Sequence, residues 1–425
     1  MKAGIAKVDI TPEGPVWMSG YAARDRRSEG VYHNLFAKAL VLDNGETQAA
    51  IVTTDLIGFD EQKCDEVKER IQDLAGFTPD QVILSGTHTH TGPEIEFDPS
   101  SYNRDRVNVE YSRELTDTLA NLVRAAAEKL EEVTMDFASA PCTIAVNRRL
   151  KTESGIKMRP NPAGITDPVV SVLRASREDG TPLAILMSYP CHPTTLGDYL
   201  IGGDYPGYAQ DAVEEALEGC TAMFMLGCAG DQKVRNVDGR GGFRKGPFQV
   251  AQSIGEELGR AVLLALGGDT KPVEGLFGMQ TETVSLPLQP TPSREEFESW
   301  LDDKNRFRAV WAKDMIEILD SGENLINDRS LTVQVLNIGS FVLVTLSAEI
   351  CVGYSLRLKS ELAPRPVIIS AFTNGMIGYI PTEAMVPEGG YEVDGSYFYH
   401  SMPAPYAAEV EETIVANVNR MVSNS

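Results

Sequence analysis

Two histidines separated by a single residue, His88 and His90, are the side chains of this sequence best placed to do chemistry. They follow a short apolar run, Val82–Leu84, that is typical of a buried strand. In an extended backbone, side chains two positions apart lie on the same face, so both imidazoles can point at one spot. Converging neutral imidazoles are a common start of a zinc site. The pair is also compatible with a polar loop or with two hydrogen-bonded histidines in the core, so the pair alone does not establish a metal site.

A third histidine and a carboxylate strengthen the metal-site interpretation. The chain has only five histidines, and His192 comes shortly after the apolar run Leu183–Ser188. Glu349 follows the apolar run Phe341–Leu346 in the same way. Folds that mix helices and strands usually build their sites at the carboxyl ends of strands. We therefore expect His88, His192 and Glu349 to converge.

Other chemically capable side chains receive plainer interpretations. His33 precedes an apolar strand and is predicted to be structural. His400 lies in an aromatic loop near Tyr391. It could line the substrate pocket, but we favour a position outside it. Cys191 has no acid–base partner specified around it, which favours a buried small residue over a nucleophile.

Two loops are candidates for contact with a substrate. The segment Gly227–Gln232 is either a tight connection from a strand to a helix, which we favour, or a loop that brings Asp231 or a backbone amide to the site. Near the amino terminus, Trp17 and Met18 are predicted to wall the substrate cleft.

Apolar periodicity predicts a fold in which strands and helices interleave, with hairpins inserted. The predicted strands are residues 3–10, 37–42, 49–54, 82–84, 135–140, 169–175, 183–188, 222–226, 281–286, 332–338, 341–346 and 367–371. The predicted helices are residues 60–74, 111–130, 208–217, 247–266, 294–319 and 404–422, of which 294–319 is expected to be a solvated lid or connector. The pattern favours an α/β fold with mixed β-sheets flanked by helices, in one large domain over residues 1–425.

Composition narrows the class of protein. A net charge of −23 argues against nucleic acid and anionic membranes as partners, because the overall field repels both. A local cationic pocket around Arg148, Arg149 or Arg159 is compatible with that average. Six cysteines without a Cys-x-x-Cys pair, no signal peptide and no membrane span predict a soluble cytoplasmic protein with reduced thiols.

Several short blocks, in order along the chain, resemble the neutral, non-lysosomal ceramidases. The Thr-His-Thr-His-Thr-Gly-Pro block around His88 is moderately specific, whereas the ordered series is strong. The likeness runs from the first residues to about Tyr391. The blocks are residues 4–12, 18–21, 87–93, 147–148, 191–194, 203–208, 347–349, 378–382 and 391–392.

The resemblance implies one zinc ion per chain and a set of residues around it. The implied zinc ligands are His88, His192, Glu349 and Tyr379. The implied substrate-facing residues are His90, Arg148 and Tyr391. Two imidazoles and a carboxylate leave a zinc position for water, whose pKa falls toward ~7, so that it can attack an amide carbonyl.

The substrate-facing residues and two aspartates then have expected roles. Arg148, His90 or Tyr391 stabilises the oxyanion, and a neutral His90 can donate a proton to the leaving nitrogen. Asp204 and Asp231 are candidates for the partners that fix the tautomers of the ligand histidines.

The sequence also departs from the family pattern. Lys233 stands where the ceramidases have the serine of Gly-Asp-x-Ser-Pro-Asn, so no serine role can be transferred. The chain is expected to lack the carboxyl-terminal immunoglobulin-like β-sandwich and the secretion signal of those enzymes. We therefore expect the zinc centre to be kept and ceramide specificity to be lost, in favour of a small polar or anionic substrate.

The favoured function is a zinc-dependent amidohydrolase that cleaves a C–N bond, other than a peptide bond, in a small soluble molecule. The first alternative keeps the metal chemistry but cleaves an ester, a lactone or a cyclic amide. The second is a metal- or ligand-binding protein without turnover, motivated by the missing serine, and the third is a purely structural role for the histidines. The sequence leaves the substrate, the oligomeric state and the native metal open, since sites with nitrogen and oxygen ligands accept several divalent ions.

Overall fold

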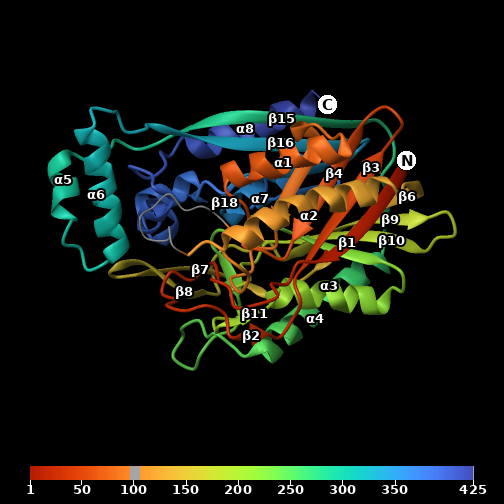
Figure 1. Cartoon of the computed structure of the whole chain (residues 1–425), viewed down its shortest axis with the longest axis horizontal. Helices are drawn as coiled ribbons and strands as arrows, with labels where there is room; N and C mark the ends of the chain where they lie inside the picture. The colour runs from red at the N-terminus through yellow and green to blue at the C-terminus, as the bar shows by residue number, and fades with distance from the viewer. Residues whose placement is uncertain (96–105, 425) are drawn as a thin grey trace.

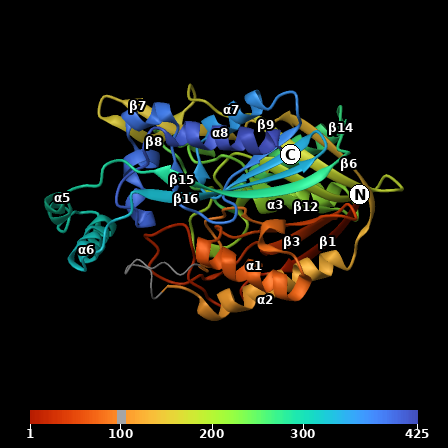
Figure 2. The same cartoon turned by 90° about the horizontal axis from the view of Figure 1, so that it is seen from above.

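Two β-sheets packed face to face form the centre of the protein, with helices on both outer faces (Figure 1). The computed structural model describes residues 1–95 and 106–424. It confirms the predicted α/β class with mixed sheets flanked by helices. The four layers are clearest from above, where α1 and α2 lie on one side of the sheets and α7 and α8 lie on the other (Figure 2).

The larger sheet has nine strands in the order β12-β10-β9-β6-β1-β3-β4-β5, with β14 paired to β6. The β4–β5 and β10–β12 pairs are parallel, and the other pairs are antiparallel. The strands are β1 (Lys2–Asp9), β3 (Phe36–Asp43), β4 (Gln48–Thr54), β5 (Val82–Gly86), β6 (Glu131–Pro141), β9 (Val169–Arg177), β10 (Pro182–Tyr189), β12 (Thr221–Leu226) and β14 (Lys271–Pro272).

The second sheet has four strands and is also mixed, because only its β17–β19 pair is parallel. Its strands are β15 (Phe277–Pro287), β16 (Asp328–Ile338), β17 (Phe341–Leu346) and β19 (Val367–Ser370). Three small sheets complete the set: β2 (Gly30–Val31) with β11 (Leu200–Ile201), β7 (Ala145–Thr152) with β8 (Gly155–Asn161) and β13 (Gln232–Val234), and β18 (Glu349–Ile350) with β20 (Tyr379–Ile380).

Most of the helices cover the outer faces of the sheets. They are α1 (Glu61–Ala75), α2 (Val109–Ala127), α3 (Asp204–Ala216), α4 (Phe248–Leu266), α5 (Arg294–Ser299), α6 (Arg306–Asp320), α7 (Val352–Glu361) and α8 (Val410–Ser423). Strand alternation explains the layering, because Ala39 and Val41 of β3 face the helices while Leu40 and Leu42 face the second sheet.

Two predicted helices differ from the observed ones. The stretch 294–319 forms two helices, because Asn305 begins α6 as an N-cap whose side chain accepts a hydrogen bond from Phe307 N. The last helix begins at Val410 rather than at Ala404, since Pro403 and Pro405 disfavour a helix at its predicted start. The β7–β8 hairpin was not predicted, because half of its residues are polar and its strands show little apolar alternation.

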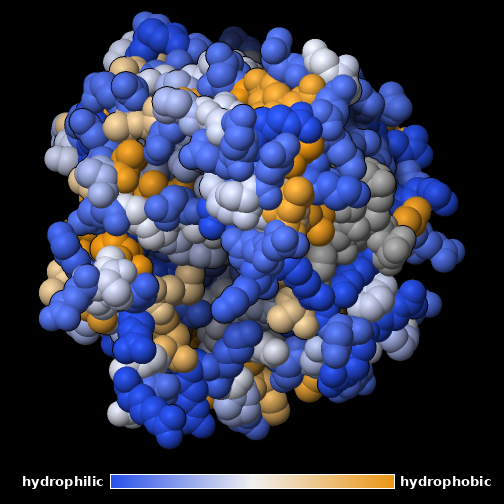
Figure 3. Space-filling view, turned by 90° about the vertical axis from the view of Figure 1, so that its left-hand side faces the viewer, coloured by the Kyte–Doolittle hydropathy of each residue, from blue (hydrophilic) through white to orange (hydrophobic). Residues whose placement is uncertain are grey.

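The α5–α6 pair projects from one end of the molecule, at the left of Figure 1. The surface of that end is mainly hydrophilic with separate hydrophobic patches (Figure 3). Short 3-10 or π turns at Pro79–Gln81, Glu383–Glu388, Tyr391–Gly395 and Tyr397–His400 shape several of the loops. No helix in residues 1–95 and 106–424 is long and apolar enough to cross a bilayer.

Candidate metal centre and active site

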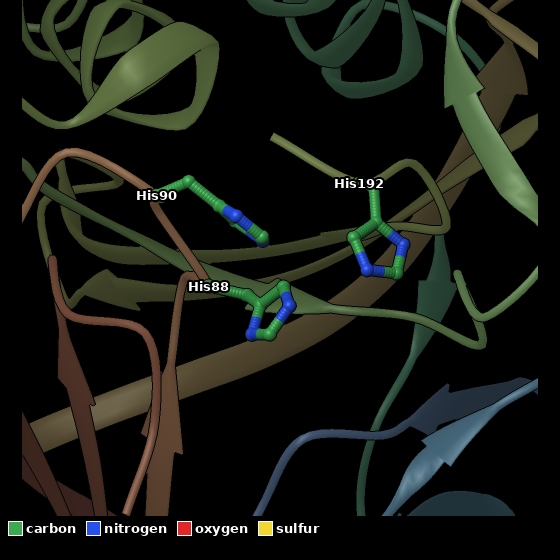
Figure 4. A group of neighbouring side chains, drawn as sticks. All are labelled: His88, His90 and His192. Atoms are coloured by element: carbon green, nitrogen blue, oxygen red, sulfur yellow. The ribbon is translucent and has the colours of Figure 1, made fainter. Parts of the chain in front are cut away.

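Three histidines meet at the carboxyl ends of strands from different parts of the larger sheet. His88 and His90 follow β5, and His192 follows β10. Their rings point toward a common space (Figure 4). One nitrogen from each ring lies within 4.8 Å of the others, so this group could hold a metal ion.

A carboxylate and a phenol complete the predicted set of four ligands. Strands β18 and β20 pair in parallel with Glu349 opposite Tyr379. Glu349 Oε2 lies 3.1 Å from His192 Nε2 and 3.8 Å from His88 Nε2. The Tyr379 hydroxyl lies 3.3 Å from His192 Nε2. The structure thus brings His88, His192, Glu349 and Tyr379 together, although they are far apart in the sequence.

Backbone carbonyls define the tautomers of both histidines of this set. His88 Nδ1 lies 2.6 Å from the carbonyl oxygen of Ile57, and His192 Nδ1 lies 2.6 Å from that of Ala229. A ring nitrogen that faces a carbonyl must donate its proton, so the Nε2 atom of each neutral ring carries a lone pair. Both lone pairs face the carboxylate of Glu349.

The prediction that Asp204 and Asp231 fix these tautomers is wrong, because the carbonyls already do so. Asp231 is fully buried and accepts hydrogen bonds from the Asn147 side chain and the Val352 amide. Asp204 accepts from the amides of Thr195 and Leu196. Both carboxylates therefore hold loops rather than histidines.

The turn that carries Asp231 leads into β13 and not into the predicted helix. The carbonyl of Ala229 in this turn accepts the hydrogen bond from His192.

Burial keeps the histidines neutral. It lowers the pKa of His88 to about 4 and holds the pKa of His90 well below its usual value. Burial and the nearby Arg148 lower the pKa of His192. Burial alone would raise the pKa of Glu349, whereas positive charge on the side of His192 and His88 lowers it to about 2, so the carboxylate is ionised when a cation lies between it and the neutral rings.

These protonation states fit a divalent cation. An ionised carboxylate that faces two imidazole lone pairs is repelled unless a positive charge lies between them. The Nε2 atoms of His88 and His90 are buried, and neither has a hydrogen-bond partner among the described residues. Neutral imidazole and carboxylate are also the donors that zinc and related ions bind.

Arg148 and Tyr391 flank the group of histidines. The Arg148 guanidinium carbon lies 5.2 Å from the centroid of the Tyr379 ring and 5.6 Å from that of Tyr391. Arg148 Nε donates to Glu392 Oε1 over 2.7 Å, and Arg149 donates to Glu392 Oε2 over 2.8 Å. No role was predicted for Glu392, because nothing local in the sequence shows that it meets residues 148 and 149.

A cavity of about 410 Å³ opens beside the histidines. Trp17 and Met18 line it, as predicted, and so does His400, contrary to the favoured prediction. Helix α6 forms part of the wall through Phe307 and other residues, so the predicted lid or connector borders the site. The remaining histidine, His33, lies elsewhere and contacts Asp211 over 2.8 Å, in agreement with a structural role.

Comparison with known proteins identifies the family. Residues 1–243 match the model described as neutral/alkaline non-lysosomal ceramidase, N-terminal. The chain belongs to the neutral/alkaline non-lysosomal ceramidase family. The resemblance drawn from the sequence blocks is therefore confirmed.

Named ceramidases are distant relatives of this chain. Neutral ceramidase A of Dictyostelium discoideum is 26% identical over 239 residues, which are 52% of this chain and 32% of that protein. The neutral ceramidase of Pseudomonas aeruginosa is 26% identical over 218 residues, which are 48% of this chain and 32% of that protein. The match thus spans about a third of the length of these curated relatives.

The likeness of the fold extends much further than the likeness of sequence. The crystal structure of neutral ceramidase from Pseudomonas aeruginosa superposes with a TM-score of 0.76 at 20% identity. The match covers 99% of this chain and 74% of that chain. Residues 244–425, which lie outside the family match, therefore also share the fold of that structure.

Proposed function

We propose that this ceramidase-family chain is a zinc-dependent hydrolase that cleaves the amide bond of a small molecule. The observation that carries the proposal is the ionised carboxylate of Glu349, which faces the lone pairs of two neutral imidazoles, His88 and His192. The ceramidase names of the relatives support the amide as the bond that is cleaved. In this proposal, residues 1–425 act as one catalytic domain.

Four side chains would hold the metal ion: His88, His192, Glu349 and Tyr379. A bound zinc ion supplies a Lewis acid that polarises a carbonyl and makes water a nucleophile near neutral pH. The chain keeps the two imidazoles neutral through burial, which leaves their lone pairs available at physiological pH. The Ile57 and Ala229 carbonyls fix the rings in the tautomer that a metal needs.

The neighbouring side chains would act on the substrate. Arg148 is buried and one of its terminal nitrogens has no hydrogen-bond partner among the described residues, so it can bind the oxygen of the carbonyl under attack. His90 lines the cavity with an unpartnered Nε2, and its Nδ1 lies 2.9 Å from the Gly20 carbonyl oxygen, so Nε2 carries a lone pair that can accept a proton from the attacking water and then pass it to the leaving nitrogen. Tyr391 also lines the cavity and can donate a hydrogen bond to the same carbonyl oxygen.

The proposed substrate is a small amide more polar than ceramide. Lys233 at the position of the family serine motivates this choice, and so do the charged residues Arg24, Glu94, Arg106 and Asp314 in the cavity wall. Such groups favour a substrate with a polar or charged portion, because leaving them desolvated without a partner is costly.

The test is metal content together with amine release. Wild-type protein purified without added metal is compared with His88→Ala and Glu349→Ala by plasma mass spectrometry, and a panel of soluble amides is screened for free amine. We expect about one zinc per chain in the wild type, little in either variant, and amine release only by the zinc-loaded form. A wild type that binds no stoichiometric metal, even after dialysis against zinc, would refute the proposal.

A further inference from the structure

Three cations gather beside His90 without a carboxylate in contact. Among the described residues, no carboxylate oxygen lies within ion-pair distance of Arg24, Lys233 or Lys245, although the chain as a whole carries a net charge of −23. Arg24 is buried, and its terminal nitrogens donate only to backbone carbonyls. The nearest acidic influences, Asp198 and Asp204, act on these groups from beyond contact distance.

Tyr21 links two of these cations to the cavity. Its ring lines the cavity and lies 4.9 Å from the His90 ring, centroid to centroid. Lys245 Nζ lies 3.2 Å from the centroid of the Tyr21 ring, and the Arg24 guanidinium carbon lies 4.8 Å from it. The stem of Lys245 crosses directly over Gly197, where any side chain would collide with it. The Lys245 residue is exposed as a whole, and its amine lies between Gly197 and the aromatic ring next to His90.

Lys233 approaches the same region from the other side of the site. Strand β13 pairs with β7 and places Lys233 opposite Val146, and a backbone bridge joins Lys233 to His192. Its amine lies 5.0 Å from the centroid of the Phe243 ring and has no hydrogen-bond partner among the described residues. Burial and the charges of Arg148 and Lys245 lower the pKa of Lys233 to about 8.

Cations that repel one another, with no acid between them, form a site that an anion completes. A carboxylate is such an anion, because ammonium groups bind it through charge-assisted hydrogen bonds. Its place in the substrate follows from His90, whose ring contacts Tyr21 and which is the residue proposed to protonate the leaving nitrogen. The carboxylate therefore belongs to the leaving amine, within a few bonds of the amide that is cleaved.

We propose that the substrates are N-acylated amino acids, whose carboxylate binds Lys233 and Lys245 in the field of Arg24. This inference rests on the proposed function, because it names the substrate class of the same site. The acyl chain would lie in the cavity between the amino-terminal loop and α6. Water then adds to the amide, and the products are a carboxylic acid and a free amino acid.

The first experiment compares N-octanoylglycine with its uncharged analogue N-octanoylglycinamide, which contains the same scissile amide. We expect the kcat/KM of the wild type for N-octanoylglycine to be about tenfold higher than for N-octanoylglycinamide, as one charge-assisted contact predicts. Lys233→Met and Lys245→Met should each abolish most of this preference. Lys271→Met is the matched control, because Lys271 is exposed on β14 and should leave the preference unchanged.

The second experiment measures binding without turnover. The sulfonamide analogues N-(octylsulfonyl)glycine and N-(octylsulfonyl)glycinamide resist hydrolysis, and their dissociation constants are measured by calorimetry on the purified protein. Tighter binding of the acid, lost in the two lysine variants, supports the inference. The inference would be overturned if the glycine and glycinamide forms bound equally and were cleaved equally. That result would leave the proposed function intact. Acid-selective binding without release of amine would instead refute the hydrolase and keep the anion site.

Discussion

The carboxylate of Glu349 lies 3.1 Å from a nitrogen of His192 that has no proton to offer it, because the other ring nitrogen donates its proton to the Ala229 carbonyl. Two acceptors at this distance destabilise a buried site unless a cation joins them. The pair is therefore strained in the absence of a metal ion and stable in its presence, which makes Glu349 the sharpest place to test the metal centre.

The first prediction follows from this pair. Glu349→Gln should weaken zinc binding by about 100-fold or more, since it replaces an anionic ligand with a neutral amide. This loss exceeds the one expected from mutating a residue that only hydrogen-bonds to a ligand. Competition with a fluorescent zinc chelator measures the affinity. Glu383→Gln is the control, because Glu383 is exposed at the start of the turn Glu383–Glu388. Equal affinity of Glu349→Gln and wild type would remove Glu349 from the metal site.

The second prediction concerns stability and pH. Burial alone would raise the pKa of Glu392, but Arg148 and Arg149 outweigh burial and hold it below the usual value of 4.5. Because the folded-state pKa is lower than the unfolded one, the ionised carboxylate stabilises the fold above about pH 4.5, and this stabilisation fades as the pH falls through the folded-state pKa. Glu392→Gln should therefore lower the free energy of unfolding by about 3 kcal/mol at pH 7.

The measurement is urea unfolding of wild type and Glu392→Gln at several pH values between 7 and 4. The difference between the two proteins should shrink below about pH 4.5. Glu388→Gln is a matched control, since Glu388 contacts Arg149 over 3.2 Å but is 39% exposed and should cost less than about 1 kcal/mol. A gap that stays constant over the whole range would contradict the assignment of the effect to the charge of Glu392.

The sequence predicted the elements of this fold better than the contacts between them. Strands such as 37–42 and 341–346 were found because their apolar runs fill the space between layers, and a buried strand needs little else. His88 and His192 were found because histidines are rare in this chain and both follow strands. Their grouping with Glu349 was predicted from the same positions at strand ends.

What the sequence could not show are the partners supplied by the fold. The carbonyls of Ile57 and Ala229 are backbone atoms, so no residue type announces that they fix a histidine tautomer. Aspartates were the natural candidates for that role, and they proved to bind loop amides instead. Helix α6 has an amphipathic pattern that predicts a helix, but the pattern does not say which neighbour the helix will meet.

The third prediction tests α6 as a wall of the substrate cavity. Phe307 lines the cavity, so Phe307→Ala should remove apolar contact with a bound acyl group and raise KM by about tenfold or more, from the ~1.5–3 kcal/mol that burying such a ring contributes. The value of kcat and the zinc content should change little. Leu301→Ala is the control, because Leu301 is 42% exposed and does not line the cavity. A normal KM in Phe307→Ala would place the substrate elsewhere.

The last prediction separates two ways of holding the metal. The three imidazoles of His88, His90 and His192 lie close enough to bind an ion together, whereas the proposed set replaces His90 with Glu349 and Tyr379. If His90 acts on the substrate, His90→Ala should keep about one zinc per chain while kcat/KM falls by about 100-fold or more, the usual cost of losing a general acid. His33→Ala, outside the site, should keep both the zinc and the rate.

A second variant reaches the same ring without removing it. Gly20 has φ +87°, and a Cβ atom there would lie 2.5 Å from His90 Cγ, so Gly20→Ala must displace the imidazole. The zinc content of Gly20→Ala should stay at the wild-type level while its rate falls with that of His90→Ala. Loss of zinc from both variants would mean that His90 is a ligand, and its role as proton donor to the leaving amine would have to pass to another residue of the cavity.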